Sequence, residues 1–259
     1  MKRTLTLLAI LAAIGPAWGA EVVSSNIVGY NKIQLRAGFN LIGTQFLNIG
    51  QGEKDIQELI VGETDLPGID PTTYDFHTEI RIWNGGGYDT YGWSDADDGT
   101  DINWEESNSK WLDQKQENIV EFETKNGQGF WIKTDEASTI TVAGEVPEEA
   151  TKETAIVSGF NLIANPFPEA IHIQNIQSSD LPGIDPTTYD FHTEIRIWNG
   201  GGYDTYGWSD ADDGTDINWE ESNSKWLDQK QENIVDVTIG IGEGFWIKTD
   251  APGKITFTK

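Results

Sequence analysis

The stretch EIRIWNGGGYDTYGW, residues 79–93, decides the fold class of this chain. Its first four residues alternate between charged and apolar side chains, as in a half-buried β-strand. The turn begins with Asn84-Gly85, and both residue types tolerate the positive φ that tight hairpins require. Residues 88–93 can return as the partner strand, so the stretch predicts a β-hairpin. Trp83 lies on the face opposite Ile80 and Ile82, so it is either exposed or both faces of the strand are covered.

The hairpin belongs to a tract that the chain contains twice. Residues 65–120 recur without a change as residues 180–235, while the flanks match imperfectly. GFNLI at 38–42 returns at 159–163, and GFWIKTD at 129–135 returns at 244–250. The repeat predicts two modules, residues 20–145 and 146–259, that fold separately about a polar hinge at 146–149. Functional and filler residues are copied alike inside the identical tract, so the diverged flanks are more informative.

The remaining local patterns are also mostly β patterns. Further strands are predicted at 119–122, 130–133, 139–142 and 254–257, and one short helix at 54–61 with Ile56, Leu59 and Ile60 on one face. A weaker helical counterpart lies near residues 171–176. Six to eight short strands per module predict an all-β protein of two tandem β-sandwiches or β-barrels, each with at most one short helix.

Residues 1–19 have the pattern of a secretory signal peptide. Lys2 and Arg3 precede an apolar run at 5–14, and small residues at Ala17 and Gly19 suit a signal peptidase. The apolar run is too short to span a bilayer. We therefore expect cleavage after Gly19 and a secreted product, either extracellular or at the cell surface.

The charge of the chain restricts its partners. It has 17 basic and 43 acidic residues, and loss of Lys2 and Arg3 changes the net charge from −26 to −28. Such a field repels nucleic acid and anionic lipid, and favours cations, basic surfaces and neutral ligands. The chain has no cysteine, so disulfides do not stabilise it. Burial, hydrogen bonding, bound metal or assembly must do so instead.

Several short motifs resemble a repeat found in exported proteins of planctomycete- and verrucomicrobia-like bacteria. They are NIVGY at 26–30, GFNLI at 38–42, IWN at 82–84, GW at 92–93, GQGFWI at 127–132 and GEVP at 144–147. The form GFNLIANPF is intact at 159–167, whereas the first module has GTQF at 43–46. The resemblance covers nearly all of the mature chain. It implies a secreted β module and carries no catalytic motif.

An acidic loop in each copy of the tract could bind calcium. Calcium prefers six to eight oxygen ligands, which closely spaced carboxylates around a glycine can supply. The spacing differs from that of an EF-hand, and a solvated acidic turn is the alternative. The candidate ligands are Asp95, Asp97, Asp98, Asp101 and Asn103, with their copies Asp210, Asp212, Asp213, Asp216 and Asn218.

An aromatic set in each copy could instead bind carbohydrate. Trp and Tyr faces stack on sugar rings, although such side chains more often form the core of a β module. The candidates are Trp83, Tyr88, Tyr91 and Trp93, with their copies Trp198, Tyr203, Tyr206 and Trp208.

We expect no enzymatic activity and no cofactor other than calcium. The chain lacks a thiol and the common nucleophile, metalloprotease and nucleotide-binding motifs. Carboxylate pairs that a glycoside hydrolase needs, such as Glu105-Glu106 and Asp97-Asp98, arise from composition alone in so acidic a chain. The sequence therefore favours a secreted structural or adhesive protein of the cell surface or matrix. Its expected partner is itself, as an oligomer or filament, or an extracellular polysaccharide.

Overall fold

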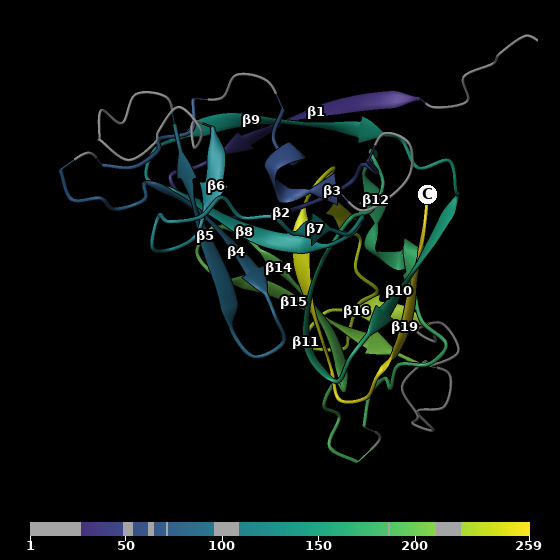
Figure 1. Ribbon diagram of the computed structural model, residues 1–259. Coiled ribbons are helices and arrows are strands. Elements are labelled where there is room, and N and C mark those ends of the chain that lie inside the picture. The colour runs from purple at the N-terminus through teal and green to yellow at the C-terminus, as the bar shows by residue number, and fades with distance from the viewer. Residues whose placement is uncertain are drawn as a thin grey trace, which may run out of the picture.

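The computed structural model describes residues 27–48, 54–61, 65–70, 72–95, 109–185, 187–210 and 224–259. Over these residues the protein is all-β, as predicted, with several antiparallel sheets and two three-residue 3₁₀ helices (Figure 1). We call residues 27–145 the first half and residues 146–259 the second half.

The strands of the first half surround one 3₁₀ helix. They are β1 (Val28–Leu35), β2 (Gly38–Gly43), β3 (Lys54–Asp55), η1 (Ile56–Glu58), β4 (Thr78–Trp83), β5 (Tyr88–Ser94), β6 (Lys110–Leu112), β7 (Glu123–Thr124), β8 (Gly129–Thr134) and β9 (Ser138–Glu145).

The second half repeats this order with one additional short strand. Its elements are β10 (Thr151–Ile156), β11 (Gly159–Ala164), β12 (Ile171–His172), η2 (Ile173–Asn175), β13 (Ile176–Gln177), β14 (Thr193–Trp198), β15 (Tyr203–Ser209), β16 (Lys225–Leu227), β17 (Thr238–Ile239), β18 (Gly244–Thr249) and β19 (Gly253–Thr258).

Each half has one five-stranded antiparallel sheet. The orders are β2-β8-β4-β5-β6 and β11-β18-β14-β15-β16. A second, smaller sheet pairs β1 with β9 in the first half. In the second half, β19 lies between β10 and β13 and pairs with both (Figure 1). The registers agree as well, since Leu35 pairs with Ser138 and its counterpart Ile156 pairs with Gly253.

The predicted hairpin forms as β4 and β5. Trp83 pairs with Tyr88 across the four-residue turn 84–87. The side chain of Asn84 accepts hydrogen bonds from the backbone N–H groups of Gly86 and Gly87, at 3.2 and 2.9 Å. Gly85 has φ of +96°, which a side chain would disfavour. The turn therefore has a local chemical cause.

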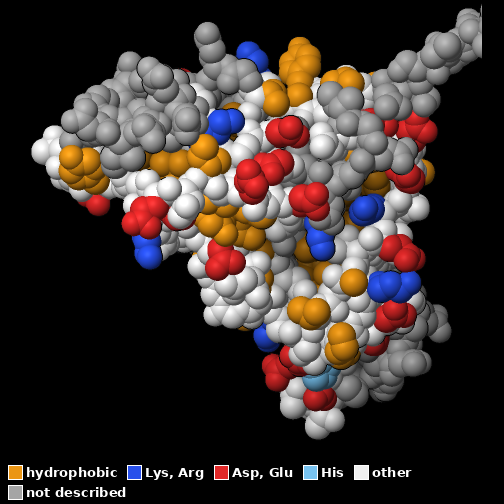
Figure 2. Space-filling view, in the orientation of Figure 1, with side chains coloured by type: hydrophobic (Ala, Val, Ile, Leu, Met, Phe, Trp, Pro, Cys, Tyr) orange, Lys and Arg blue, Asp and Glu red, His pale blue; other side chains and the backbone are white. Residues whose placement is uncertain are grey.

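The core of each half lies between its five-stranded sheet and the β1–β9 or β10–β19 pair, an arrangement compatible with a β-sandwich. Alternate residues of β4 point into it, so Ile80 and Ile82 are buried while Glu79, Arg81 and Trp83 face outward. Trp111 and Phe130 are completely buried in the first core, and Trp226 and Phe245 in the second. Acidic side chains are scattered over the surface among apolar ones (Figure 2).

Two local predictions were wrong. The helix predicted at 54–61 is reduced to η1, because the backbone N–H groups of Ile56 and Val61 donate to Phe122 and Thr141 of other segments. The strand predicted at 119–122 is replaced by a single bridge from Ile119 to Leu112 and by β7. Ile56, Leu59 and Ile60 are nevertheless all buried, as their spacing predicts.

Candidate functional site

The edge strands β2 and β11 meet where the two halves contact each other, a region that we call the seam. Gly43 donates a backbone hydrogen bond to the carbonyl of Gly242 at 3.0 Å, and Ala164 donates one to Gly127 at 2.8 Å. Gly43 and Ala164 occupy equivalent positions in the two copies, as do Gly127 and Gly242. The seam is therefore locally two-fold symmetric.

Small residues allow this close approach of backbones. A Cβ atom on Gly43 would lie 2.1 Å from the Cβ of Ala164, and one on Gly129 would lie 2.4 Å from the carbonyl oxygen of Ile163. Real Cβ atoms do not come so close to other heavy atoms. The repeated motifs at 38–42 and 127–132, and their copies, thus build the seam.

An aromatic cluster fills the seam from both sides. The indole N–H of Trp83 donates to the carbonyl of Phe160 at 2.8 Å, and that of Trp198 donates to Phe39 at 3.2 Å. Trp83 meets the edge of Trp246 with ring centroids 5.2 Å apart. The fully buried members of the cluster are Leu41, Trp131, Leu162 and Trp246.

This cluster is a third core that belongs to both halves. Burial of each large apolar side chain is worth about 1.5–3 kcal/mol, so the seam contributes several kcal/mol to folding. Trp83, whose exposure the sequence left undecided, packs against the second half, whereas Arg81 on the same face of β4 packs against Phe39 of its own half. The polar hinge at 146–149 gives no indication of such a shared core.

An aromatic hollow of about 300 Å³ opens on one side of the seam. Burial raises the pKa of the Tyr88 phenol above its ordinary value, and that phenol accepts a hydrogen bond from the indole of Trp131 at 3.2 Å. The side chains that line the hollow are Trp83, Tyr88, Phe160, Arg196, Tyr203 and Trp246.

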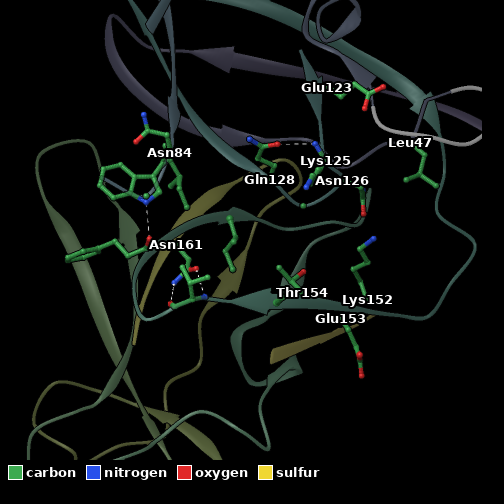
Figure 3. Close-up of a pocket in the computed structure, with 18 residues that line it drawn as sticks. Leu47, Asn84, Glu123, Lys125, Asn126, Gln128, Lys152, Glu153, Thr154 and Asn161 are labelled. Carbon is green, nitrogen blue, oxygen red and sulfur yellow. Dashed lines mark hydrogen bonds between the residues drawn. The ribbon is translucent and has the colours of Figure 1, made fainter. Parts of the chain in front are cut away.

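A groove of about 900 Å³ adjoins this hollow, and Trp83 and Phe160 line both (Figure 3). One wall comes from the first half, with Asn84 and the loop 123–128, and the other from β10 and β11. The side chain of Lys152 points across the groove toward the loop of Asn126, whereas Glu153 points away (Figure 3).

The polar groups of the groove are held in place by hydrogen bonds. The amide of Asn126 donates to the carbonyl of Pro166 at 3.0 Å, and Asn161 donates to Val157 at 2.8 Å. The carbonyl oxygen of the Gln128 side chain accepts from the backbone of Lys125 at 2.9 Å. Two lysines and two glutamates line the groove. Glu153 pairs with Lys254 at 3.0 Å, so the groove does not share the excess of negative charge of the whole protein.

The structure divides the aromatic residues proposed for carbohydrate binding. Trp83, Tyr88, Trp198 and Tyr203 lie at the seam. Trp93 and Trp208 are only 4% and 1% exposed, so the proposal that these two bind sugar is wrong. Tyr91 and Tyr206 pack against the two main cores and are partly buried.

The proposed calcium ligands fall mostly outside the described residues. Asp97, Asp98, Asp101, Asn103, Asp212, Asp213, Asp216 and Asn218 are among them. Asp95 and Asp210 are described, and their carboxylates accept hydrogen bonds from the backbone of Gly68 and Gly183 at 3.0 and 2.9 Å. The described residues contain no cluster of three or more metal-binding side chains.

A histidine–aspartate pair in each half escaped the sequence analysis. Nδ1 of His77 lies 2.8 Å from Asp135, and Nδ1 of His192 lies 2.8 Å from Asp250. The hydrogen bond from His77 lowers the pKa of Asp135. Each pair joins the residue before the central strand β4 or β14 to the residue after β8 or β18, which the linear sequence could not reveal.

The groove itself was also missed. Its distinguishing residues include Lys125, Asn126, Lys152 and Thr154, which lie in the flanks where the two copies differ. Divergence between the copies was the one available signal, because no single motif marks these positions.

The described residues contain no helix of sufficient length and hydropathy to cross a bilayer. No family model, curated protein or solved structure matches the chain.

Proposed function

We propose that this is a secreted, non-catalytic adhesive protein that holds a neutral extracellular polysaccharide in the groove between its halves. The observation that carries the proposal is the groove itself, in which Trp83 and Phe160 adjoin amide, lysine and threonine side chains. Export is supported by the signal-peptide pattern of residues 1–19.

The chemistry of the groove suits a sugar chain. Aromatic surfaces cover the apolar faces of pyranose rings, and polar groups fixed by hydrogen bonds can satisfy hydroxyls without reorganisation. The lysine and amide groups can donate hydrogen bonds to sugar hydroxyls, and the net charge of the whole protein opposes an anionic ligand.

A glycan array followed by calorimetry with soluble neutral polysaccharides tests the proposal. Lys152→Glu and Thr154→Arg alter the β10 wall, and each is expected to weaken binding roughly tenfold or more, which corresponds to about 1.4 kcal/mol. Asn31→Glu is the matched control, because Asn31 occupies the position equivalent to Lys152 in the first half. Equal affinity in all three variants, or no binding by the wild type, contradicts the proposal.

A structural, self-associating role is the second candidate, and strand β1 supports it. Ile27, Val28 and Tyr30 are 67%, 56% and 75% exposed at the beginning of this strand. β1 pairs with β9 of its own half, so it is not a free strand that could be donated to the sheet of another molecule. Only its other edge and this apolar surface remain for association. Light scattering should show larger particles for the mature chain than for Tyr30→Lys.

Calcium stabilisation remains a proposal based on the acidic loops. Millimolar calcium should raise the melting temperature by binding the native state. Asp95, Asp97, Asp210 and Asp212 changed together to Asn should remove most of the rise. If magnesium or sodium chloride at matched ionic strength has the same effect, screening is the cause and there is no calcium site.

A further inference from the structure

We propose that each chain carries one extended polysaccharide track and not two, because Arg36 and Ile33 close the place where a symmetric second groove would lie. The inference rests on the proposed function for its ligand, whereas its geometric part is independent of any ligand.

The two-fold relation of the seam identifies the equivalent positions. GFNLI begins at Gly38 in one copy and at Gly159 in the other, so Arg36 corresponds to Val157 and Ile33 to Thr154. The strand registers agree, since Ile33 pairs with Ile140 and Thr154 pairs with Ile255. The identical tract supplies the same Trp-Asn-Gly turn to both sides.

On the first-half side, two side chains cross the seam. A Cβ atom on Gly200 would lie 2.8 Å from Nη1 of Arg36. One on Gly242 would lie 3.1 Å from Oε1 of Gln45 and 3.2 Å from Cδ1 of Ile33. Asn40, the equivalent of the groove residue Asn161, is consequently buried with 7% exposure.

On the groove side, these crossing contacts are missing. A Cβ on Gly85, the equivalent of Gly200, would meet nothing within 4 Å. A Cβ on Gly127 would meet Pro166 first, at 3.3 Å, with no atom of Thr154 among its three nearest neighbours. Val157 and Thr154 are too short to span the space that Arg36 and Ile33 fill.

The open side continues beyond the groove in both directions. The aromatic hollow shares Trp83 and Phe160 with it. A further hollow of about 270 Å³, which ends at Pro147 and Phe167, shares Leu47, Asn126, Lys152 and Glu153. Three adjoining hollows suit a chain of several sugar units rather than a mono- or disaccharide.

The first experiment measures the geometry alone, and the absence of native cysteine makes it clean. Thr154→Cys and Ile33→Cys place one thiol at each of the two equivalent positions, and maleimide labelling rates are compared in the folded protein. Cys at 154 should react several-fold faster, and adding Arg36→Val should accelerate labelling at position 33. Equal rates at the two positions would overturn the inference whether or not any sugar binds.

The second experiment uses calorimetry with a neutral oligosaccharide series taken from a positive polysaccharide. Wild type should bind one chain per protein, with affinity rising over several sugar units. Val157→Arg should reduce affinity roughly tenfold, and Arg36→Val should leave the first site unchanged. Two sites in the wild type, or unchanged affinity in Val157→Arg, would overturn the inference. No binding by wild type would instead remove the proposed function, and with it the ligand named here.

Discussion

Gln45 is the least favourably placed polar side chain of the seam. It is completely buried, and neither carboxamide atom has a hydrogen-bond partner among the described residues. A buried polar group without a partner costs about 1–3 kcal/mol. Gln45→Met keeps the volume and removes the amide, so we expect the free energy of unfolding to rise by about 1 kcal/mol. Urea denaturation measures the change.

Gln174 is the matched comparison, because its amide is fully used. Its Nε2 donates to the carbonyls of Trp226 and Val235 at 2.9 and 3.0 Å, and its Oε1 accepts from the backbone of Trp226 at 3.0 Å. Gln174→Met should lower the free energy of unfolding by about 2–3 kcal/mol. Effects of the same sign at both positions would contradict this explanation.

Glu243 gives the seam a pH dependence. Burial raises the pKa of this carboxyl, and the backbone N–H of Gly240 opposes the rise only in part. A raised native pKa means that the contribution to stability is full below the unfolded pKa and is lost as the pH rises through the native pKa. Glu243→Gln, which introduces the residue found at the equivalent position 128, should therefore stabilise the protein at pH 7 and have little effect near pH 3.

Denaturation of Glu243→Gln and wild type across this pH range measures the difference. Glu148→Gln is the control, because Glu148 is exposed and should give no pH-dependent difference from wild type. A stability gain for Glu243→Gln that does not shrink on acidification would exclude burial as the cause.

The sequence predicts the burial of single residues well where one face of a strand packs against the core. Ile80 and Ile82 are buried as their alternation requires. The sequence does not determine whether Trp83 is exposed or covered. Only the structure shows that Phe160 and Trp246 of the second half contact it. Groove residues such as Lys152 carry no local pattern, because their role depends on which segment lies opposite them.

At the scale of elements, β5 depends on close contact with the segment that precedes β4. A Cβ atom on Gly92 would lie 2.0 Å from the ring of Phe76. Gly92→Ala must displace this ring, so we expect a loss of about 1–3 kcal/mol from overpacking. Thermal and urea unfolding give the measurement.

Gly86→Ala serves as its control in the same hairpin. A Cβ there would meet nothing within 4 Å, and Gly86 is not among the glycines with positive φ. The expected change is about 0.5 kcal/mol or less. Similar losses at both glycines would indicate a general effect of glycine replacement rather than contact with Phe76.

Elements were predictable where backbone pairing and apolar pattern coincide. The strands around 130–133, 139–142 and 254–257 form at these positions as β8, β9 and β19. The pattern at 119–122 has another cause, since Phe122 packs against Tyr91 at 5.4 Å and its carbonyl accepts from Ile56. The spacing of apolar residues indicates which side chains are buried. It does not indicate which strand their backbone pairs with.

For the whole molecule, the seam predicts how one half behaves alone. The second half by itself would expose Leu162 and Trp246, and the seam's two-fold symmetry lets a second copy cover them. We therefore expect residues 146–259 to form a homodimer at micromolar concentration. Sedimentation equilibrium measures the association.

Leu162→Asp in the same fragment should shift it to monomer. Ile234→Asp should leave it dimeric, because Ile234 is exposed and lies beside β16, at the opposite edge of the sheet from β11. A stable monomer for the unaltered fragment would show that the seam is dispensable for each half. Only the repeat, and not the way its copies meet, could be predicted from the sequence, because no local pattern indicates that Trp83 lies against Phe160 or Trp198 against Phe39.

The difference between Arg36 and Val157 has an evolutionary consequence. In a dimer of identical subunits, every substitution appears on both sides of the two-fold axis, so one groove cannot close while the other stays open. Fusion of the copies into one chain removes this constraint. The residues that distinguish the sides, at 33, 36, 154 and 157, all lie outside the tract that is identical in both copies. Gene conversion between the two tracts would therefore keep their sequences identical without changing the residues that make the two sides different.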